Sequence, residues 1–221
     1  ADYFGSASAV TVGVFGDYHG GDAEGDTLVN VEKVIGSDFG DTFGDFTEVR
    51  AGAGNDAIYV ASVFPGADVP GVIVDGGDGV DTAIYTTWGE GVVIDLTSGV
   101  GAAAETLISI ENISGSGFSD TLMGGAEANL FKGNNGDDVL IGGAGADKLD
   151  GGNGSDTASY ETASAAVHAN LAASATNTGD AAGDTYISIE NLTGSNFADL
   201  LTGDANVNTL SGNAGNDVMN G

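Results

Sequence analysis

The chain contains no cysteine and only 4 basic residues. The absence of cysteine excludes a disulfide framework and metal sites built from thiolates. With 33 acidic residues, the formal net charge is -29, which argues against nucleic acid and anionic membranes as partners, since both bind basic surfaces. No stretch approaches the roughly 18 consecutive apolar residues of a membrane-spanning helix, so we expect no membrane insertion.

Motifs for catalysis are also missing. The only histidines, His19 and His168, lie at non-equivalent places in the repeats described below. The sequence contains neither the HExxH motif of zinc proteases nor the GxSxG motif of serine hydrolases. We therefore predict that this segment is not an enzyme.

The acidic charge has to be explained within a folded protein, because 41% of the residues are apolar, too many for a disordered acidic tail. A compact fold brings the carboxylates together, and their repulsion opposes folding unless cations bind. The alternative is a merely soluble acidic surface, as in a halophilic protein. The regular spacing of the aspartates favours the cation.

That spacing is nine residues. Three blocks follow one another without a spacer over residues 133–159: GNNGDDVLI, GGAGADKLD and GGNGSDTAS. Each has glycine at positions one and four and aspartate at position six. Related blocks begin at Gly36, Ala51, Gly76, Gly115, Gly124, Gly194, Gly203 and Gly212.

A second, much longer period is set by Gly36, Gly115 and Gly194, which are equally spaced along the chain. Each of them lies within a copy of one longer segment, such as ISIENISGSGFSDTLMG. We predict three repeat units, at residues 1–75, 76–150 and 151–221. The first and last units are incomplete, so we expect a piece of a longer tandem array, although a natural terminus within a repeat would look the same.

Each nine-residue block combines turn-forming residues with a short strand-like run such as Val139-Leu140-Ile141. Strands this short must stack on neighbours. If each block is half a coil, turns that are two blocks apart lie on the same side and share a cation. Asp120, Asp138 and Asp156 have this spacing, whereas the intervening block has Asn129, so we expect one edge to be richer in aspartate.

Alternation of apolar residues predicts further strands around Val10 and Val12, Val167 and Ala169, and Ile187 and Ile189. Asp41 and Asp56 are closer together than two full blocks, which predicts a shortened turn. Ala-rich stretches at 101–104 and 172–182 contain Gly, Asn or Thr and are expected to be loops. No amphipathic helix is predicted.

The GGxGxDxUx pattern resembles the RTX calcium-binding repeats of bacterial secreted proteins. GGAGADKLD, GGNGSDTAS and GGDGVDTAI match it best, and the similarity extends over almost the whole chain. The resemblance implies an all-β fold, a right-handed parallel β-roll whose glycine-rich turns bind several Ca²⁺ ions. It also implies export by a type I system, with folding outside the cell.

The same resemblance implies that Ca²⁺ is bound by the sixth-position aspartates and by backbone carbonyls of the first four residues of each block. The implied aspartate ligands are Asp41, Asp56, Asp81, Asp120, Asp138, Asp147, Asp156, Asp199 and Asp217. The implied turn ligands in the best-formed stretch are Gly133, Asn135, Gly136, Gly142, Ala144, Gly145, Gly151, Asn153 and Gly154.

The eighth-position residues are predicted to fill the core: Phe43, Ile58, Leu122, Phe131, Leu140, Leu149, Leu201, Leu210 and Met219. A second acidic cluster places Asp26 and Asp184 in glycine-spaced positions that correspond to Glu105. We treat Asp26 and Asp184 as either further ligands or solvated turn residues. Glu32, Glu111 and Glu190 recur before the repeats, where bonding to a backbone amide is a better role than catalysis.

Two functions fit the sequence. The first is a calcium-stiffened segment of a structural or adhesive protein, such as an adhesin, surface layer or filament, which is secreted or on the cell surface. The second is a calcium-folded module of a secreted hydrolase, such as a serralysin-like protease or a lipase. Candidate partners besides calcium are copies of the chain stacked end to end and cell-surface or matrix glycans. Trp88 would serve a glycan site, but we expect it to be an exposed loop aromatic.

Overall fold

The computed structural model describes residues 1–14, 17–28, 31–44, 46–60 and 71–221. Within these residues the secondary structure consists of β-strands and three short 3-10 helices, with no α-helix. No helix among them is long and apolar enough to cross a membrane. The all-β prediction is therefore confirmed.

The chain divides into two compact units, each made of stacked coils. The first unit comprises Ala1–Trp88 and Ser98–Ser114. Its elements are β1 (Thr11–Val14), β2 (Asp17–His19), η1 (Gly21–Ala23), β3 (Lys33–Ile35), β4 (Thr42–Gly44), β5 (Glu48–Ala53), β6 (Ala57–Tyr59), β7 (Ile73–Asp78), β8 (Thr82–Ile84), β10 (Thr106–Ile108) and β11 (Asn112–Ser114). Its strands form rows in the orders β11-β8-β6-β4-β1-β2 and β10-β7-β5-β3.

The second unit comprises Gly89–Thr97 and Gly115–Gly221. Its elements are β9 (Val93–Asp95), β12 (Thr121–Met123), β13 (Leu130–Asn135), β14 (Val139–Ile141), β15 (Lys148–Asn153), β16 (Thr157–Ser159), β17 (His168–Asn170), η2 (Ser174–Thr176), η3 (Gly179–Ala181), β18 (Thr185–Ile187), β19 (Asn191–Thr193), β20 (Leu200–Thr202), β21 (Thr209–Ser211) and β22 (Val218–Asn220). Its strands form rows in the orders β18-β15-β13, β21-β19-β16-β14-β12-β9 and β17-β20-β22.

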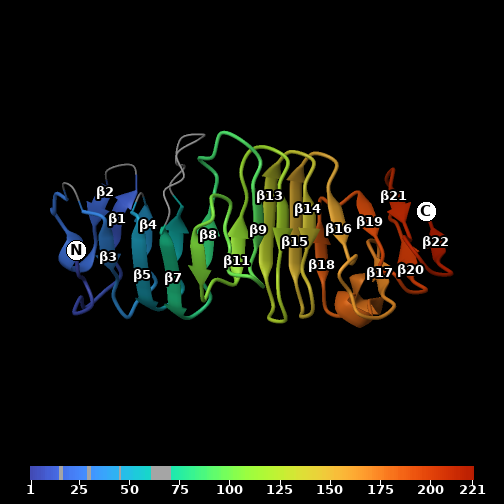
Figure 1. Cartoon of the computed structure of the whole chain (residues 1–221), viewed down its shortest axis with the longest axis horizontal. Coiled ribbons are helices and arrows are strands. Elements are labelled where there is room, and N and C mark those ends of the chain that lie inside the picture. Colours follow the sequence, from blue (N-terminus) through green and yellow to red (C-terminus); the bar gives the residue numbers. More distant parts are fainter. Residues whose placement is uncertain (15–16, 29–30, 45, 61–70) are drawn as a thin grey trace. The chain divides into compact units, whose positions relative to one another are not determined.

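Parallel pairing between successive coils gives the fold its register. Thr121 of β12 pairs with Val139 of β14, and Val139 pairs with Thr157 of β16, so that each step covers two blocks of the repeat. Leu130 of β13 pairs with Lys148 of β15 at the same spacing on the other side. Figure 1 shows the paired strands β13 and β15 lying side by side. Each block is therefore half a coil, and the predicted parallel β-roll is confirmed.

The coils of the first unit differ in length. Thr42 of β4 pairs with Ala57 of β6, a step shorter than two blocks, whereas Ala57 pairs with Thr82 of β8 after a step that is longer than two blocks. The short coil predicted between Asp41 and Asp56 is thus present. Register is nevertheless kept, since Thr42–Gly44, Ala57–Tyr59 and Thr82–Ile84 pair residue by residue.

The core is a column of eighth-position side chains. In strands such as β6 and β12 the central side chain is buried and its two neighbours are half-buried, since side chains alternate along a strand. Seven of the nine predicted core residues are fully buried: Phe43, Ile58, Leu122, Phe131, Leu140, Leu149 and Leu201. The prediction is wrong for Met219, which is 51% exposed, and Leu210 is only half-buried, because β21 and β22 have a paired coil on one side only.

Another correction concerns Ile187–Ile189. Strand β18 ends at Ile187, and Ser188 has a φ of 48°, which turns the chain and buries Ile189. Ser109 has the same conformation at the equivalent place, with a φ of 49°. The period-two pattern therefore marks a strand end followed by a turn. The alternation of apolar residues does not reveal that the serine adopts a left-handed backbone conformation.

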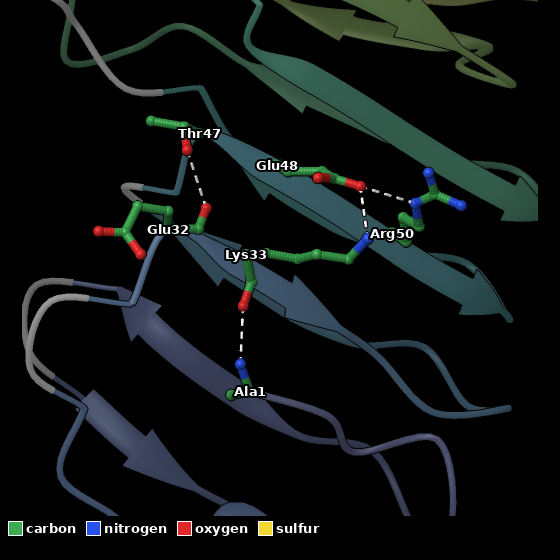
Figure 2. Close-up of polar contacts among 6 residues, drawn as sticks. All are labelled: Ala1, Glu32, Lys33, Thr47, Glu48 and Arg50. Carbon is green, nitrogen blue, oxygen red and sulfur yellow. Dashed lines mark hydrogen bonds and ion pairs between the residues drawn. The ribbon is translucent and has the colours of Figure 1, made fainter.

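Basic residues lie on the outer face, away from the core. Lys33 of β3 and Arg50 of β5 both contact the Glu48 carboxylate, at 2.6 Å and 2.9 Å (Figure 2). These two cations hold the pKa of Glu48 below its ordinary value. Among the described residues these are the ion pairs found, and neither involves a sixth-position aspartate. The charge of the turns is therefore not balanced by lysine or arginine there.

Candidate metal-binding turns

The sixth-position aspartates form a continuous hydrogen-bonded row along one edge of the second unit. The Asp120 amide donates to Oδ1 of Asp138 at 2.7 Å, and the Asp138 amide donates to Oδ1 of Asp156 at 2.9 Å. The Asp156 amide then donates to Oε2 of Glu190 at 2.9 Å. We call such a row an aspartate ladder. Each carboxylate satisfies the amide of the equivalent residue one coil earlier.

The same ladder occurs in the first unit. The amide of Asp41 donates to Asp56 at 2.6 Å, that of Asp56 donates to Asp81 at 2.8 Å, and that of Asp81 donates to Glu111 at 2.9 Å. Two ladders thus end at a glutamate, Glu111 or Glu190. The predicted role of these glutamates as acceptors for a backbone amide agrees with the structure.

Two shorter ladders complete the set. On the opposite edge of the second unit, the Asn129 amide donates to Oδ1 of Asp147, and the Asp147 amide donates to Oδ1 of Asp184, both at 2.9 Å. Near the end of the chain, the Asp199 amide donates to Asp217 at 3.0 Å. The edge with Asn129 has fewer aspartates, as the sequence indicates.

Five sixth-position carboxylates have an oxygen that is buried and receives no hydrogen bond. These are the Oδ2 atoms of Asp56, Asp81, Asp138, Asp147 and Asp156. Each of these residues is at most 2% exposed. A buried anionic oxygen without a donor is costly, so the arrangement requires either a proton or a cation.

The pKa values report this cost. Burial raises the pKa of Asp56 and of Asp147 to about 7, and that of Asp138 to about 6. Burial also raises the pKa of Asp81 and Asp156. Neighbouring carboxylates such as Asp184 beside Asp147 add to the effect. The buried carboxylates of these turns therefore need a positive charge beside them, and no basic side chain of the described residues provides it.

Glycine at position one makes room for each carboxylate. A Cβ atom on Gly133, Gly142 or Gly151 would overlap the side chain of the aspartate five residues later. These three glycines are buried, whereas the third-position residues Asn135, Ala144 and Asn153 are exposed. Each carboxylate therefore folds back over its own turn.

Glycine at position four has a different role. Gly136, Gly145 and Gly154 have φ of 127°, 133° and 152°, a region that residues with a side chain rarely adopt. Gly154 also lies against the carbonyl of Gly136, so that a Cβ would overlap it. The turns consequently stack backbone on backbone, which leaves carbonyl groups rather than side chains around the carboxylates.

This donor set suits Ca²⁺, a hard cation that takes about 6–8 oxygen ligands from carboxylates and backbone carbonyls. Among the described residues no group of three or more His, Cys, Asp or Glu side chains forms a metal cluster. A Ca²⁺ site in these turns would therefore combine one or two carboxylates with backbone oxygens. The assignment of individual ligands stays a prediction.

The second acidic cluster has a role that the sequence does not reveal. Tyr160 donates to Oδ2 of Asp184 at 2.7 Å, and Tyr85 donates to Glu105 at 2.8 Å. Tyr3 donates to the exposed Asp26 at 2.9 Å. Asp184 is only 1% exposed, so it is not a solvated turn residue. The sequence does contain a signal for these pairs, because a tyrosine recurs two residues after Ala1, Ala83 and Ala158.

Trp88 is not an exposed loop aromatic, and this prediction is wrong. The side chain is 8% exposed, and its Nε1 donates to the Val60 carbonyl at 3.0 Å. Its ring lies 5.5 Å from the ring of Tyr85. Trp88 therefore belongs to the core of the first unit, beside the Tyr85–Glu105 pair.

Comparison with known families supports the site. A family model described as RTX calcium-binding nonapeptide repeat (4 copies) matches residues 114–149, 123–158 and 189–221. No curated protein matches the chain. The matched residues include the turns of Asp120, Asp138, Asp147 and Asp156. Residues 114–158 and 189–221 therefore carry RTX calcium-binding nonapeptide repeats, and repeats of this kind bind several Ca²⁺ ions.

Proposed function

We propose that the chain is a calcium-binding tandem-repeat segment of an extracellular structural or adhesive protein, such as an adhesin, surface layer or filament, and that it folds on binding Ca²⁺ after export. The observation that carries this proposal is the set of five buried carboxylate oxygens without donors, in a chain of net charge -29. Repeats of this family are typical of secreted bacterial proteins.

The coupling of calcium to folding follows from the small size of the strands. Most strands have three residues, so each contributes one inward side chain and cannot form alone. The carboxylates of each ladder come together only when the coils stack. Binding free energy is therefore folding free energy, as in other proteins whose metal site is absent from the unfolded chain.

Circular dichroism of the chain with excess Ca²⁺ and with a chelator tests this proposal. We expect a β-sheet spectrum and a cooperative thermal transition with calcium, and a largely disordered spectrum without it. Mg²⁺ at the same concentration is the control, because its preference for octahedral coordination with retained waters does not suit these turns. Equal β content and equal melting temperature with Ca²⁺ and with chelator would contradict the proposal.

A structural role is favoured because successive units repeat the same contacts. The ladder of Asp41, Asp56, Asp81 and Glu111 has the same order as that of Asp120, Asp138, Asp156 and Glu190. The repeats are calcium-binding structure and not catalytic by themselves. In a hydrolase, the catalytic residues would lie in another domain, so the sequence of the parent protein distinguishes the two functions.

Partners other than calcium belong to this proposal. Copies of the chain stacked end to end would extend the parallel rows of strands, since the ends of a solenoid present unpaired backbone groups. Surface glycans are the other candidate. Trp88, the residue considered above for stacking on a sugar, is buried and does not offer that contact.

A further inference from the structure

The sixth-position aspartates fall into two classes. Asp56, Asp81, Asp138, Asp147 and Asp156 have an unpartnered buried oxygen. Asp41, Asp120 and Asp199 are equally buried, at 1–3% exposure, but both of their oxygens accept hydrogen bonds. The two classes differ in sequence, since the second occurs in blocks of the form GSxFxD.

A serine at position two satisfies the carboxylate in these blocks. In the block of Asp120, the Ser116 amide donates to Oδ2 at 2.7 Å and the Ser116 hydroxyl donates to Oδ1 at 2.7 Å. The Val92 amide of the preceding coil adds a third hydrogen bond to Oδ1, at 2.8 Å. Burial raises the pKa of the Asp120 carboxyl, and the donors Val92 and Ser116 act against that rise. Both oxygens of Asp120 thus have donors within the protein, whereas the five carboxylates above each have one oxygen without a donor.

The same contacts occur in the other two GSxFxD blocks. Ser37 donates its amide and hydroxyl to Asp41 at 2.6 Å and 2.8 Å, and Ser195 donates to Asp199 at 2.6 Å and 2.7 Å. The preceding coil contributes the amides of Val10 and Val167, each at 2.8 Å. The same serine–aspartate contacts therefore occur in all three GSxFxD blocks, one in the first unit and two in the second.

The backbone of the two classes also differs. Where position four is glycine, positions two and four have positive φ, as at Gly143 and Gly145 with 92° and 133°. In the GSxFxD blocks neither the serine nor the phenylalanine has a positive φ. We call the first kind open turns and the second kind closed turns. Phenylalanine at position four excludes the open turn, because its Cβ opposes the positive φ and the close stacking seen at Gly154.

Closed turns occupy a fixed place in the ladders. Asp41 precedes Asp56 and Asp81, Asp120 precedes Asp138 and Asp156, and Asp199 precedes Asp217. In the block of Asn208 the Asp204 amide donates to Asn208 Oδ1 at 2.8 Å, which is the closed contact with an uncharged side chain. A closed turn thus needs no carboxylate at position six.

From these contacts we infer that Asp41, Asp120 and Asp199 are not calcium ligands, and that Ser37, Ser116 and Ser195 hold these carboxylates in place of a cation. In the three ladders that start with a closed turn, calcium binding through carboxylates then begins at the second turn, at Asp56, Asp138 and Asp217. This inference rests on the calcium-binding function proposed above, and it removes three residues from the ligands that the resemblance implies.

Counting bound ions in matched variants of the whole chain tests the inference. Asp120→Asn and Asp138→Asn change the same chemical group in successive turns of one ladder. Native mass spectrometry in calcium should show the same number of ions for Asp120→Asn as for the unmodified chain, and fewer for Asp138→Asn. The closed turn at Asn208 shows that asparagine fits such a position. Loss of as many ions from Asp120→Asn as from Asp138→Asn would overturn the inference.

A second variant covers the case in which Asp120→Asn does not fold, as judged by circular dichroism in calcium. The double substitution Ser116→Gly with Phe118→Gly converts the closed turn into the open sequence and exposes the Asp120 carboxylate to a cation. We expect this variant to bind an additional ion, and an unchanged ion count would contradict the inference. If the unmodified chain binds no Ca²⁺ at all, the proposed function fails, which is a separate outcome.

Discussion

At the scale of single residues, the first-position glycine is explained by space and not by backbone conformation. Gly142 does not have a positive φ, yet a Cβ there would overlap the carboxylate of Asp147. Gly89 provides a matched comparison, since it also lacks a positive φ and a Cβ there would meet nothing within 4 Å.

We predict that Gly142→Ala lowers the free energy of unfolding of the calcium-loaded chain by about 1–3 kcal/mol, the usual cost of overpacking a well-packed site. It should also weaken calcium binding, because the Asp147 carboxylate has to move. Gly89→Ala should leave both quantities unchanged. Chemical denaturation and calorimetric titration of the two variants provide the measurement, and equal effects of both substitutions would contradict the explanation.

The tyrosine pairs act at the scale of the coil, since each joins two segments that are far apart in sequence. Tyr160 follows β16, and Asp184 precedes β18, while the Tyr160 hydroxyl also lies 2.5 Å from that of Tyr186. Because Asp184 accepts the Asp147 amide as well, the pair anchors one end of a ladder to the core.

Tyr160→Phe should cost about 2 kcal/mol of stability, because it leaves a buried carboxylate with one donor fewer. Tyr18→Phe is the control, since the Tyr18 hydroxyl has no hydrogen-bond partner among the described residues. Thermal unfolding in saturating calcium compares the two. A Tyr160→Phe variant as stable as the control would show that the hydroxyl does not hold Asp184.

The sequence predicts elements well where they depend on neighbours at fixed spacing. The regular step of two blocks places Asp120, Asp138 and Asp156 in one row, and the eighth-position pattern identifies core residues such as Leu140. Trp88 and Tyr160 were missed because their partners, Val60 and Asp184, lie 28 and 24 residues away at no regular spacing. Open and closed turns differ in φ at positions two and four. In the sequence this difference is visible only as glycine or phenylalanine at position four, and the residue type alone does not give the backbone angles.

At the scale of the whole molecule, charge links stability to pH. Burial raises the pKa of Asp56 and Asp147 from 3.8 to about 7, and that of Asp138 to about 6. Raised values in the folded state mean that the fold binds protons that the unfolded chain releases. This stabilisation is fully present below the unfolded pKa and is lost as the pH rises through the folded pKa.

In the presence of a chelator, the folded fraction and its thermal stability should therefore be highest near pH 4 and fall as the pH rises to about 7, where the chain is expected to be largely disordered. With Ca²⁺, acid should have the opposite effect, because protons compete with the cation for the same oxygens. Thermal unfolding monitored across this range, with and without calcium, measures both slopes. A stability in chelator that is constant or rises over this range would contradict the assignment of these carboxylates.

The ladders also give the stack a direction. In every ladder the amide belongs to the earlier coil and the carboxylate to the later one. Loss of the Asp138 carboxylate would leave the Asp120 amide without its acceptor. The Asp156 carboxylate would keep its hydrogen bond, because its donor is the backbone amide of residue 138. Damage at one coil therefore spreads toward the start of the chain and not toward its end, so the stack responds asymmetrically although its repeats are nearly alike.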